Sequence, residues 1–322
     1  GSSAATMATI GRISLPELSR RGYPSELSMG ALTSAGTLGI MIPPSITFIV
    51  YGVSAEVSIA RLFAAGIIPG LVLMALFMGY LMVWAIMNPD RMPAAEPRTS
   101  VVEKLRSSRH LIPIVALIAL VIGSIYTGIA TPTESAALGV AGALILSALS
   151  GTLTWQSFVE SIREAVRTSC MIAFIIMGSM FLSAAVDFTG LPHEIAKFIE
   201  SFSLSAYGLL FALTILFAIL GCFLDGVSIV VLASSLLLPT VQAAGIDLIW
   251  FGVFMVLMVE MSMVTPPVGL NLFIMQMMSG RDLGFVSRAA LPFFVIMVGF
   301  VALLVAFPQM ATHLPQILFR AP

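Results

Sequence analysis

Two proline pairs, each in the middle of an apolar segment, have the clearest chemical consequence in this sequence. Pro43-Pro44 lies within residues 27–53, and Pro266-Pro267 lies within residues 250–278. Because proline has no N–H for the carbonyl four residues earlier, each pair leaves two helical carbonyls without their usual donor. Such neutral oxygens are suitable ligands for a hard cation such as Na⁺. The carbonyls concerned are those of Gly39, Ile40, Ser262 and Met263.

Hydroxyl and carboxylate groups near the two breaks can add further oxygens. Thr37 and Ser45 flank the first break, and the second has hydroxyls of its own. Half-helix N-termini after each break are the positive ends of dipoles, which favours an anionic substrate. The predicted Na⁺ ligands are Ser2, Ser3, Gly39, Ile40, Pro43, Asp225, Ser228, Ser262, Met263 and Thr265. The predicted substrate contacts are Pro44, Ser45, Pro267 and Gly269.

Simpler structural roles compete with these assignments. Each proline pair can be a kink that neighbouring helices relieve. Asp225 can be the N-cap of a following helix, which does not exclude ion binding. Glu260, inside an apolar span, is either a functional carboxylate or a residue paired at an interface. Glu134 follows Thr131 at the spacing of a capping box, which explains it without a function.

The composition indicates that lipid is the solvent. Of 322 residues, 59% are hydrophobic and 10% are charged, whereas about a quarter of the residues of a soluble domain are charged. The formal net charge of −1 gives no support for nucleic-acid binding. No catalytic motif occurs, and the histidines and the cysteines Cys170 and Cys222 lack metal-ligand spacing, so we expect no enzyme, no cofactor and no metal other than Na⁺.

Apolar runs recur along the whole chain and predict an all-α polytopic membrane protein. Residues 88–110 form a polar, cationic linker that separates a part at 1–87 from a part at 111–322. The first part is predicted to hold a helix at 3–18, the broken helix 27–53 and a span at 67–87. In the second part we expect scaffold spans within 111–187, namely 111–126, 134–149 and 169–186, with an interfacial arm at 154–167. A short helix at 191–200 and a hairpin at about 205–244 are predicted to follow. A broken helix at about 248–278 and a final span at 291–308 end the predicted order.

A fixed offset of 223 residues aligns the two parts without gaps. It places Pro43-Pro44 on Pro266-Pro267, Pro69 on Pro292 and Gly22 on Gly245. The same offset places Ser2 on Asp225, so the first residues correspond to the tip of the second hairpin, and we expect the first hairpin to have a leading arm before residue 1. These matches predict an internal structural repeat with re-entrant helical hairpins and broken transmembrane helices.

Cationic residues predict that the two copies have opposite orientations. Arg20 and Arg21 stand near Gly22, whereas the equivalent region near Gly245 has neither Lys nor Arg. Because loops on the cytoplasmic side carry an excess of Lys and Arg, the linker and the base of the first hairpin are predicted to face the cytoplasm. An inverted repeat follows.

The segments GSSAATMATIG, GTLGIMIPPSI, GIIPG, GIATPTESAALGV, FLDGVSIVVL and VTPPVGLNLF together resemble the large membrane subunit of tripartite ATP-independent periplasmic (TRAP) transporters. The resemblance covers nearly the whole chain. It implies the fold of the ion-transporter superfamily and an elevator mechanism, with ion and substrate sites at the hairpin tips and helix breaks. It also implies a bacterial inner-membrane location, with scaffold helices expected before residue 1.

The resemblance further implies sodium-coupled uptake of an organic acid such as a C4-dicarboxylate or a sugar acid. The implied partners are a small membrane subunit on a separate chain and a periplasmic substrate-binding protein. A carrier of the same inverted-repeat type that takes dicarboxylates or tricarboxylates without a binding protein is the alternative function. A membrane scaffold without transport activity is the alternative from another class. The identity of the substrate does not follow from the sequence, because no Lys or Arg lies at a predicted break.

Overall fold

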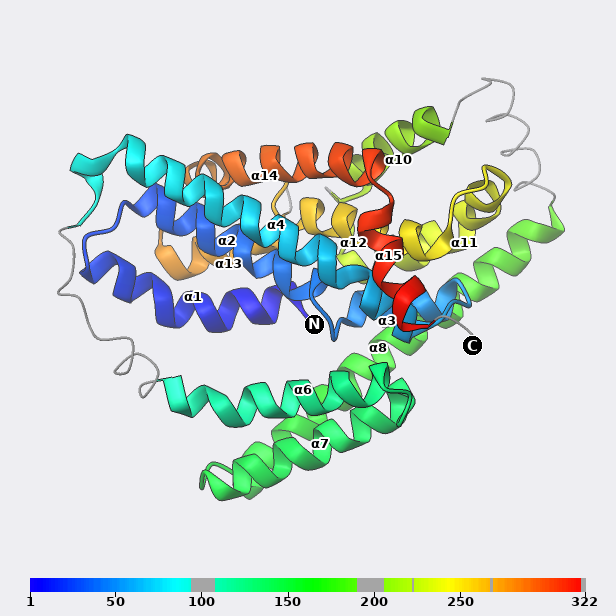
Figure 1. Cartoon of the computed structure of the whole chain (residues 1–322), viewed down its shortest axis with the longest axis horizontal. Helices are drawn as coiled ribbons and strands as arrows, with labels where there is room; N and C mark the ends of the chain where they lie inside the picture. The colour runs from blue at the N-terminus through cyan, green and yellow to red at the C-terminus, as the bar shows by residue number, and fades with distance from the viewer. Residues whose placement is uncertain (94–107, 190–205, 222, 267–268, 320–322) are drawn as a thin grey trace. The chain divides into compact units, whose positions relative to one another are not determined.

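A computed structural model describes residues 1–93, 108–189, 206–221, 223–266 and 269–319, and all regular structure within these ranges is helical (Figure 1). Five described helices are long and apolar enough to cross a membrane: Ile59–Met87, Pro132–Leu149, Trp155–Leu182, Gly226–Ala243 and Leu283–Ala306. A sixth span is possible if two helices that meet at a break, Ser25–Met41 and Ile46–Ser54, count as one. The prediction of an all-α polytopic membrane protein is therefore confirmed.

The helices of the first part are α1 (Ser3–Arg20), α2 (Ser25–Met41), α3 (Ile46–Ser54), α4 (Ile59–Met87) and the 3₁₀ turn η1 (Pro89–Arg91). After the linker come η2 (Ser108–Leu111), α6 (Ile112–Tyr126), α7 (Pro132–Leu149) and α8 (Trp155–Phe188). The remaining helices are α10 (Ala206–Gly221), α11 (Gly226–Ala243), α12 (Leu248–Met263), α13 (Leu270–Ser279), α14 (Leu283–Ala306) and α15 (Gln309–Leu318).

Several predicted boundaries are wrong, and the cause is the same in most cases. The arm at 154–167 and the span at 169–186 form one helix, α8, because a change from polar to apolar residues does not interrupt the backbone hydrogen bonds. The helices α4 and α14 begin before the predicted spans. The final helix α15 was not predicted. The short helix at 191–200 lies outside the described residues, as do Cys222 and residues 94–107 of the linker.

The described chain divides into two compact units. The smaller one, Ala94–Phe174, contains α6, α7 and the first part of α8. Within it, α6 packs against α7, and the hydroxyls of Ser124 and Ser135 lie 2.8 Å apart. The capping box at the start of α7 is confirmed, because the Thr131 N–H donates to Glu134 Oε2 at 2.8 Å and Thr131 Oγ1 accepts from the Glu134 N–H at 3.3 Å. Glu134 thus has the structural role that its spacing indicates.

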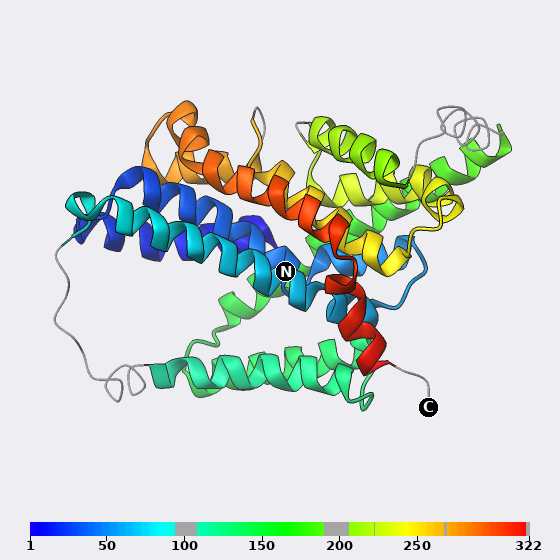
Figure 2. The ribbon, with the colours of Figure 1, turned by 45° about the horizontal axis from the view of Figure 1, so that its top comes forward.

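The larger unit, Gly1–Pro93 with Ile175–Pro322, has α12 at its centre. Every α12 residue from Trp250 to Met263 is buried, as expected for a helix that is apolar on all sides. Tyr51 on α3 donates its hydroxyl to the Leu248 carbonyl at 2.8 Å, and Trp250 Nε1 donates to the Leu304 carbonyl of α14 at 3.3 Å. Figure 2 shows α14 running beside α4, and these helices contact each other and α12.

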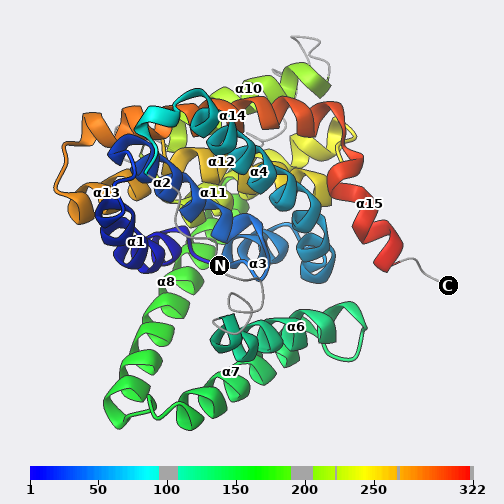
Figure 3. The same cartoon turned by 60° about the vertical axis from the view of Figure 1, so that its left-hand side comes forward.

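Helix contacts in the larger unit occur in pairs that the 223-residue offset relates. The helix α1 packs on α2 and on α13, and its offset partner α11 packs on α12 and on α3. Figure 3 shows α1 and α13 next to α2. The contact of α14 with α2 likewise matches that of α4 with α12. This pairing agrees with an internal repeat. The opposite orientation of the two copies stays a prediction.

Candidate functional site

The first break separates α2 from α3, which are bent by 42° relative to each other. The helix α2 ends at Met41, and α3 begins at Ile46 with Ser45 as its N-cap, whose hydroxyl accepts from the Phe48 N–H at 3.4 Å. The peptide between Pro43 and Pro44 is cis. Among the described residues, no hydrogen bond reaches the carbonyl of Gly39 or Ile40. Both carbonyls therefore lack a hydrogen bond, as expected beside a proline pair, and their role as cation ligands stays a prediction.

The N-terminal end of α1 lies directly against this break. The Ile46 N–H donates to the Gly1 carbonyl at 3.4 Å. A Cβ added at Gly39 would lie 2.5 Å from Thr6 Oγ1. Ser2 is the N-cap of α1, and its carbonyl accepts from the Thr6 hydroxyl at 2.8 Å. The chain therefore brings the first set of predicted ligands into one neighbourhood.

The second break lies between α12 and α13. The predicted free carbonyl of Ser262 is not free, because it accepts from the Thr265 N–H at 3.2 Å in a tight turn. The Thr265 hydroxyl donates to the Met261 carbonyl at 2.6 Å. A Cβ at Gly269 would lie 3.0 Å from the Met263 carbonyl oxygen and 2.9 Å from that of Thr265, so only glycine fits there. The carbonyl oxygens of Met263 and Thr265 therefore both lie close to the backbone of Gly269. Pro267 lies outside the described residues.

The ends of α10 and α11 meet the end of α12 at this break. A Cβ at Gly221 would lie 2.2 Å from Ser262 Cβ, and one at Gly226 would lie 2.5 Å from Val259 Cγ1 and 3.1 Å from Met263 Cε. Asp225 is exposed and caps α11: its Oδ2 accepts from the N–H groups of Val227 and Ser228, and its Oδ1 accepts from the Ser228 hydroxyl. The N-cap role considered for Asp225 is thus present, and its carboxylate stands at the predicted hairpin tip.

Glu260 is the one fully buried carboxylate in the described part of the chain. Neither carboxyl oxygen makes a hydrogen bond among the described residues. Its offset partner is Thr37, which is equally buried and donates its hydroxyl to the Ser34 carbonyl at 2.7 Å. A buried polar side chain therefore stands at the same place in both copies, with a hydrogen bond in only one of them.

One residue that the sequence analysis missed is Asn271, on the first turn of α13. It is fully buried, and its side-chain amide donates to Ser3 Oγ at 2.7 Å and to the Thr33 carbonyl at 3.2 Å. The second broken segment thereby contacts the first hairpin arm. A lone asparagine in the apolar stretch after the second proline pair was the available signal.

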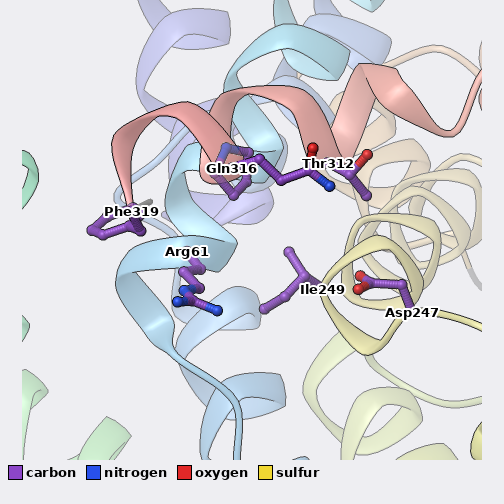
Figure 4. Close-up of a pocket in the computed structure, with 7 residues that line it drawn as sticks. Arg61, Asp247, Ile249, Thr312, Gln316 and Phe319 are labelled. Carbon is purple, nitrogen blue, oxygen red and sulfur yellow. The ribbon is translucent and has the colours of Figure 1, made fainter. Parts of the chain in front are cut away.

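A further cavity of about 340 Å³ lies away from both breaks (Figure 4). Arg61 and Asp247 line it on either side of Ile249, together with Thr312 and Gln316 of α15. The carboxylate of Asp247 accepts from the Trp250 N–H at 2.8 Å and therefore caps α12. None of the predicted site residues lies in this cavity.

Paired broken helices, each met at its break by the end of another helix, are typical of secondary transporters, in which unwound backbone lines the substrate and ion sites. Comparison with known proteins indicates the same class of protein, a transporter. Residues 1–310 match the family described as tripartite ATP-independent periplasmic transporter, DctM component. The chain belongs to this family and is a multi-pass membrane protein.

Relatives with different named substrates align over nearly the whole chain. It is 34% identical to the C4-dicarboxylate TRAP transporter large permease protein DctM of Pseudomonas aeruginosa, with 98% of this chain and 74% of the relative covered. It is 32% identical to the ectoine/5-hydroxyectoine large permease protein UehC of Ruegeria pomeroyi, with 99% and 74% covered. The sialic acid large permease protein SiaM of Vibrio cholerae is 30% identical, with 98% and 74% covered.

Proposed function

We propose that this protein is the large membrane subunit of a sodium-coupled TRAP transporter that takes up an organic acid across the bacterial inner membrane. Its proposed partners are a small membrane subunit and a periplasmic substrate-binding protein. Membership of the family supports the transport class. The main support for the proposal is that the end of another helix contacts each break. These contacts bring neutral oxygens together at two equivalent positions.

The proposed cation sites consist of carbonyl and side-chain oxygens at each break. At the first, Ser2, Ser3 and the carbonyls of Gly39 and Ile40 supply the oxygens. At the second, the Met263 carbonyl stands beside Gly269, and Asp225 adds a negative charge at the end of α11. Because the Ser262 carbonyl is already hydrogen-bonded, it contributes less than predicted. A carboxylate close to a Na⁺ ion strengthens its binding electrostatically.

The proposed substrate is an organic acid, bound by backbone dipoles. The helix α3 begins at Ile46 directly after Ser45, and its N-terminal amide groups supply positive partial charge. Two of the relatives carry names with a C4-dicarboxylate or sialic acid, both of which are organic acids. An elevator movement of the hairpin arms with the broken helices would carry both ligands across the bilayer.

Uptake into proteoliposomes tests this function. The full transporter is reconstituted with its small subunit, and radiolabelled succinate, sialic acid and ectoine are supplied in turn, each with and without the binding protein and with an inward gradient of Na⁺ or K⁺. We expect accumulation of one substrate only when both the binding protein and the Na⁺ gradient are present. Equal uptake without the binding protein would contradict the proposed assembly, and equal uptake with K⁺ would contradict sodium coupling.

A further inference from the structure

Asn271 connects the two repeats at a point where a polar side chain has no symmetric counterpart. It is the second residue of α13, directly after the second break, and its offset partner in the first copy is the apolar Phe48. The helix α13 packs against α1 and α2. A Cβ at Gly36 of α2 would lie 3.2 Å from Asn271 Nδ2 and 3.0 Å from the Met7 Cβ, so the amide fills a gap that only glycine leaves open.

The hydrogen bonds of Asn271 fix the direction of its amide. The carbonyl of Thr33 can only accept, so the group that faces it at 3.2 Å is the NH₂. The other amide hydrogen points to Ser3 Oγ at 2.7 Å. Both donors are therefore used, whereas Asn271 Oδ1 is buried and has no partner among the described residues. An unsatisfied buried acceptor costs about 1–3 kcal/mol, which a bound ligand can offset.

The chemistry of Oδ1 restricts that ligand. An oxygen with lone pairs and no hydrogen cannot bind the carboxylate of an organic acid, since both groups only accept. It can accept from a water or a substrate hydroxyl, or it can bind a cation. The neighbouring Ser3 hydroxyl is a second neutral oxygen of the kind that Na⁺ prefers, which favours the cation. We propose that Asn271 is a further ligand of the cation site at the first hairpin, so that this site is built from both repeats. The inference rests on the proposed sodium coupling.

A site of this composition has a mechanical consequence. Because Asn271 is the second residue of α13, directly after the second break, any rearrangement at the start of α13 moves an oxygen of the first site. Occupancy of one break is thereby coupled to the geometry of the other, as linkage between two sites requires.

Na⁺-dependent unfolding of the purified full chain in detergent tests the proposal without knowledge of the substrate. The unfolding temperature is measured against NaCl concentration, with choline chloride holding the ionic strength constant. The variants are Asn271→Leu, which removes the oxygen, and Asn271→Asp, which keeps an oxygen but removes both donors. Gln276→Leu, on the same helix and half-buried, is the matched control.

We expect Na⁺ to raise the unfolding temperature of the unmodified protein and of Gln276→Leu at the same half-saturating concentration. Asn271→Leu should raise that concentration about tenfold, whereas Asn271→Asp should keep or lower it. An unchanged Na⁺ dependence in Asn271→Leu would overturn the proposal. So would an equal loss in both Asn271 variants, because that pattern belongs to a residue that only joins two helices. Absence of any Na⁺ effect on the unmodified protein would instead contradict sodium coupling itself.

Discussion

The two breaks are both closely approached by another helix, but different residues make the close contacts. At the first break, glycines lie on both partners. Gly39 of the broken helix faces Thr6 of α1, and a Cβ at Gly1 would lie 3.0 Å from the Pro44 carbonyl oxygen. At the second they are on the helices that meet it, where Gly221 faces Ser262, the offset partner of Gly39. At this offset position the broken helix therefore has a glycine in the first copy and a serine in the second, where the glycine lies on the facing helix α10. This difference indicates that the contact, more than any one residue, is required.

The polar groups of the two breaks also differ. Thr37 is hydrogen-bonded, whereas its partner Glu260 has two buried oxygens without a hydrogen bond among the described residues. The second segment has Asn271 at the position where the first has the apolar Phe48. The two broken segments thus carry different buried polar groups, so the two proposed sites should not be equivalent.

Gly221→Leu should have the largest effect, because its side chain would overlap Ser262, whose Cα is only 3.1 Å from the position of a Cβ. We expect a loss of about 3 kcal/mol or more of folding free energy, since a backbone contact cannot relax as a side chain can. The amount of folded protein recovered from membranes and its unfolding temperature measure this loss. Gly299→Leu is the control, because a Cβ there meets nothing within 4 Å. Equal behaviour of the two variants would refute the contact.

Glu260→Met should stabilise the protein by roughly 1–3 kcal/mol, because it removes two buried oxygens that lack partners and keeps the side-chain volume. Denaturant or thermal unfolding in detergent measures the change. Glu26→Met, at the exposed start of α2, serves as the control and should have little effect. A drop in stability for Glu260→Met would show that the carboxyl group has a partner in the folded protein.

Asp225 variants separate the capping role from the proposed ion-binding role. Asp225→Ala removes the N-cap of α11 and should cost about 1 kcal/mol, whereas Asp225→Asn retains a capping side chain. Both should raise the half-saturating Na⁺ concentration about tenfold, because both remove the charge. Asp282→Asn, at the N-cap of α14, is the matched control. Normal Na⁺ dependence in Asp225→Asn would remove this residue from the site.

Gly39→Ala should have the smallest effect, about 1 kcal/mol, because the added Cβ meets only the side chain of Thr6 and no backbone atom among its nearest neighbours. The double variant with Thr6→Ala should recover the stability, since the overlap disappears while alanine favours the helix. The unfolding temperatures of the single and double variants show whether the effects of the two substitutions depend on each other. Gly79→Ala, where a Cβ meets nothing within 4 Å, measures only the higher helix propensity of alanine. Additive effects would show that these two residues do not meet.

The sequence allowed the breaks to be predicted because proline acts through the backbone alone. A pair of consecutive prolines removes two backbone donors wherever it stands, and the fixed offset between the two pairs predicts an internal repeat. The Thr131 and Glu134 capping box is equally local, and it was predicted for the same reason.

Features that depend on packing were missed or misplaced. The long α8 and the early starts of α4 and α14 follow from continuous backbone hydrogen bonds, which polarity patterns do not report. The bond from Asn271 to Ser3 joins residues 268 positions apart, and nothing local in either segment indicates it. The Ser262 carbonyl was predicted to be free because the tight turn at Thr265 depends on the whole break.

We propose that each break holds a Na⁺ ion and that the two sites are coupled. A Na⁺ titration of uptake by the reconstituted full transporter, at saturating substrate and binding protein, tests it most directly. We expect a sigmoidal dependence with a Hill coefficient above 1, which falls toward 1 in Asn271→Leu. A hyperbolic dependence in the unmodified transporter, or uptake that does not respond to Na⁺, would contradict it.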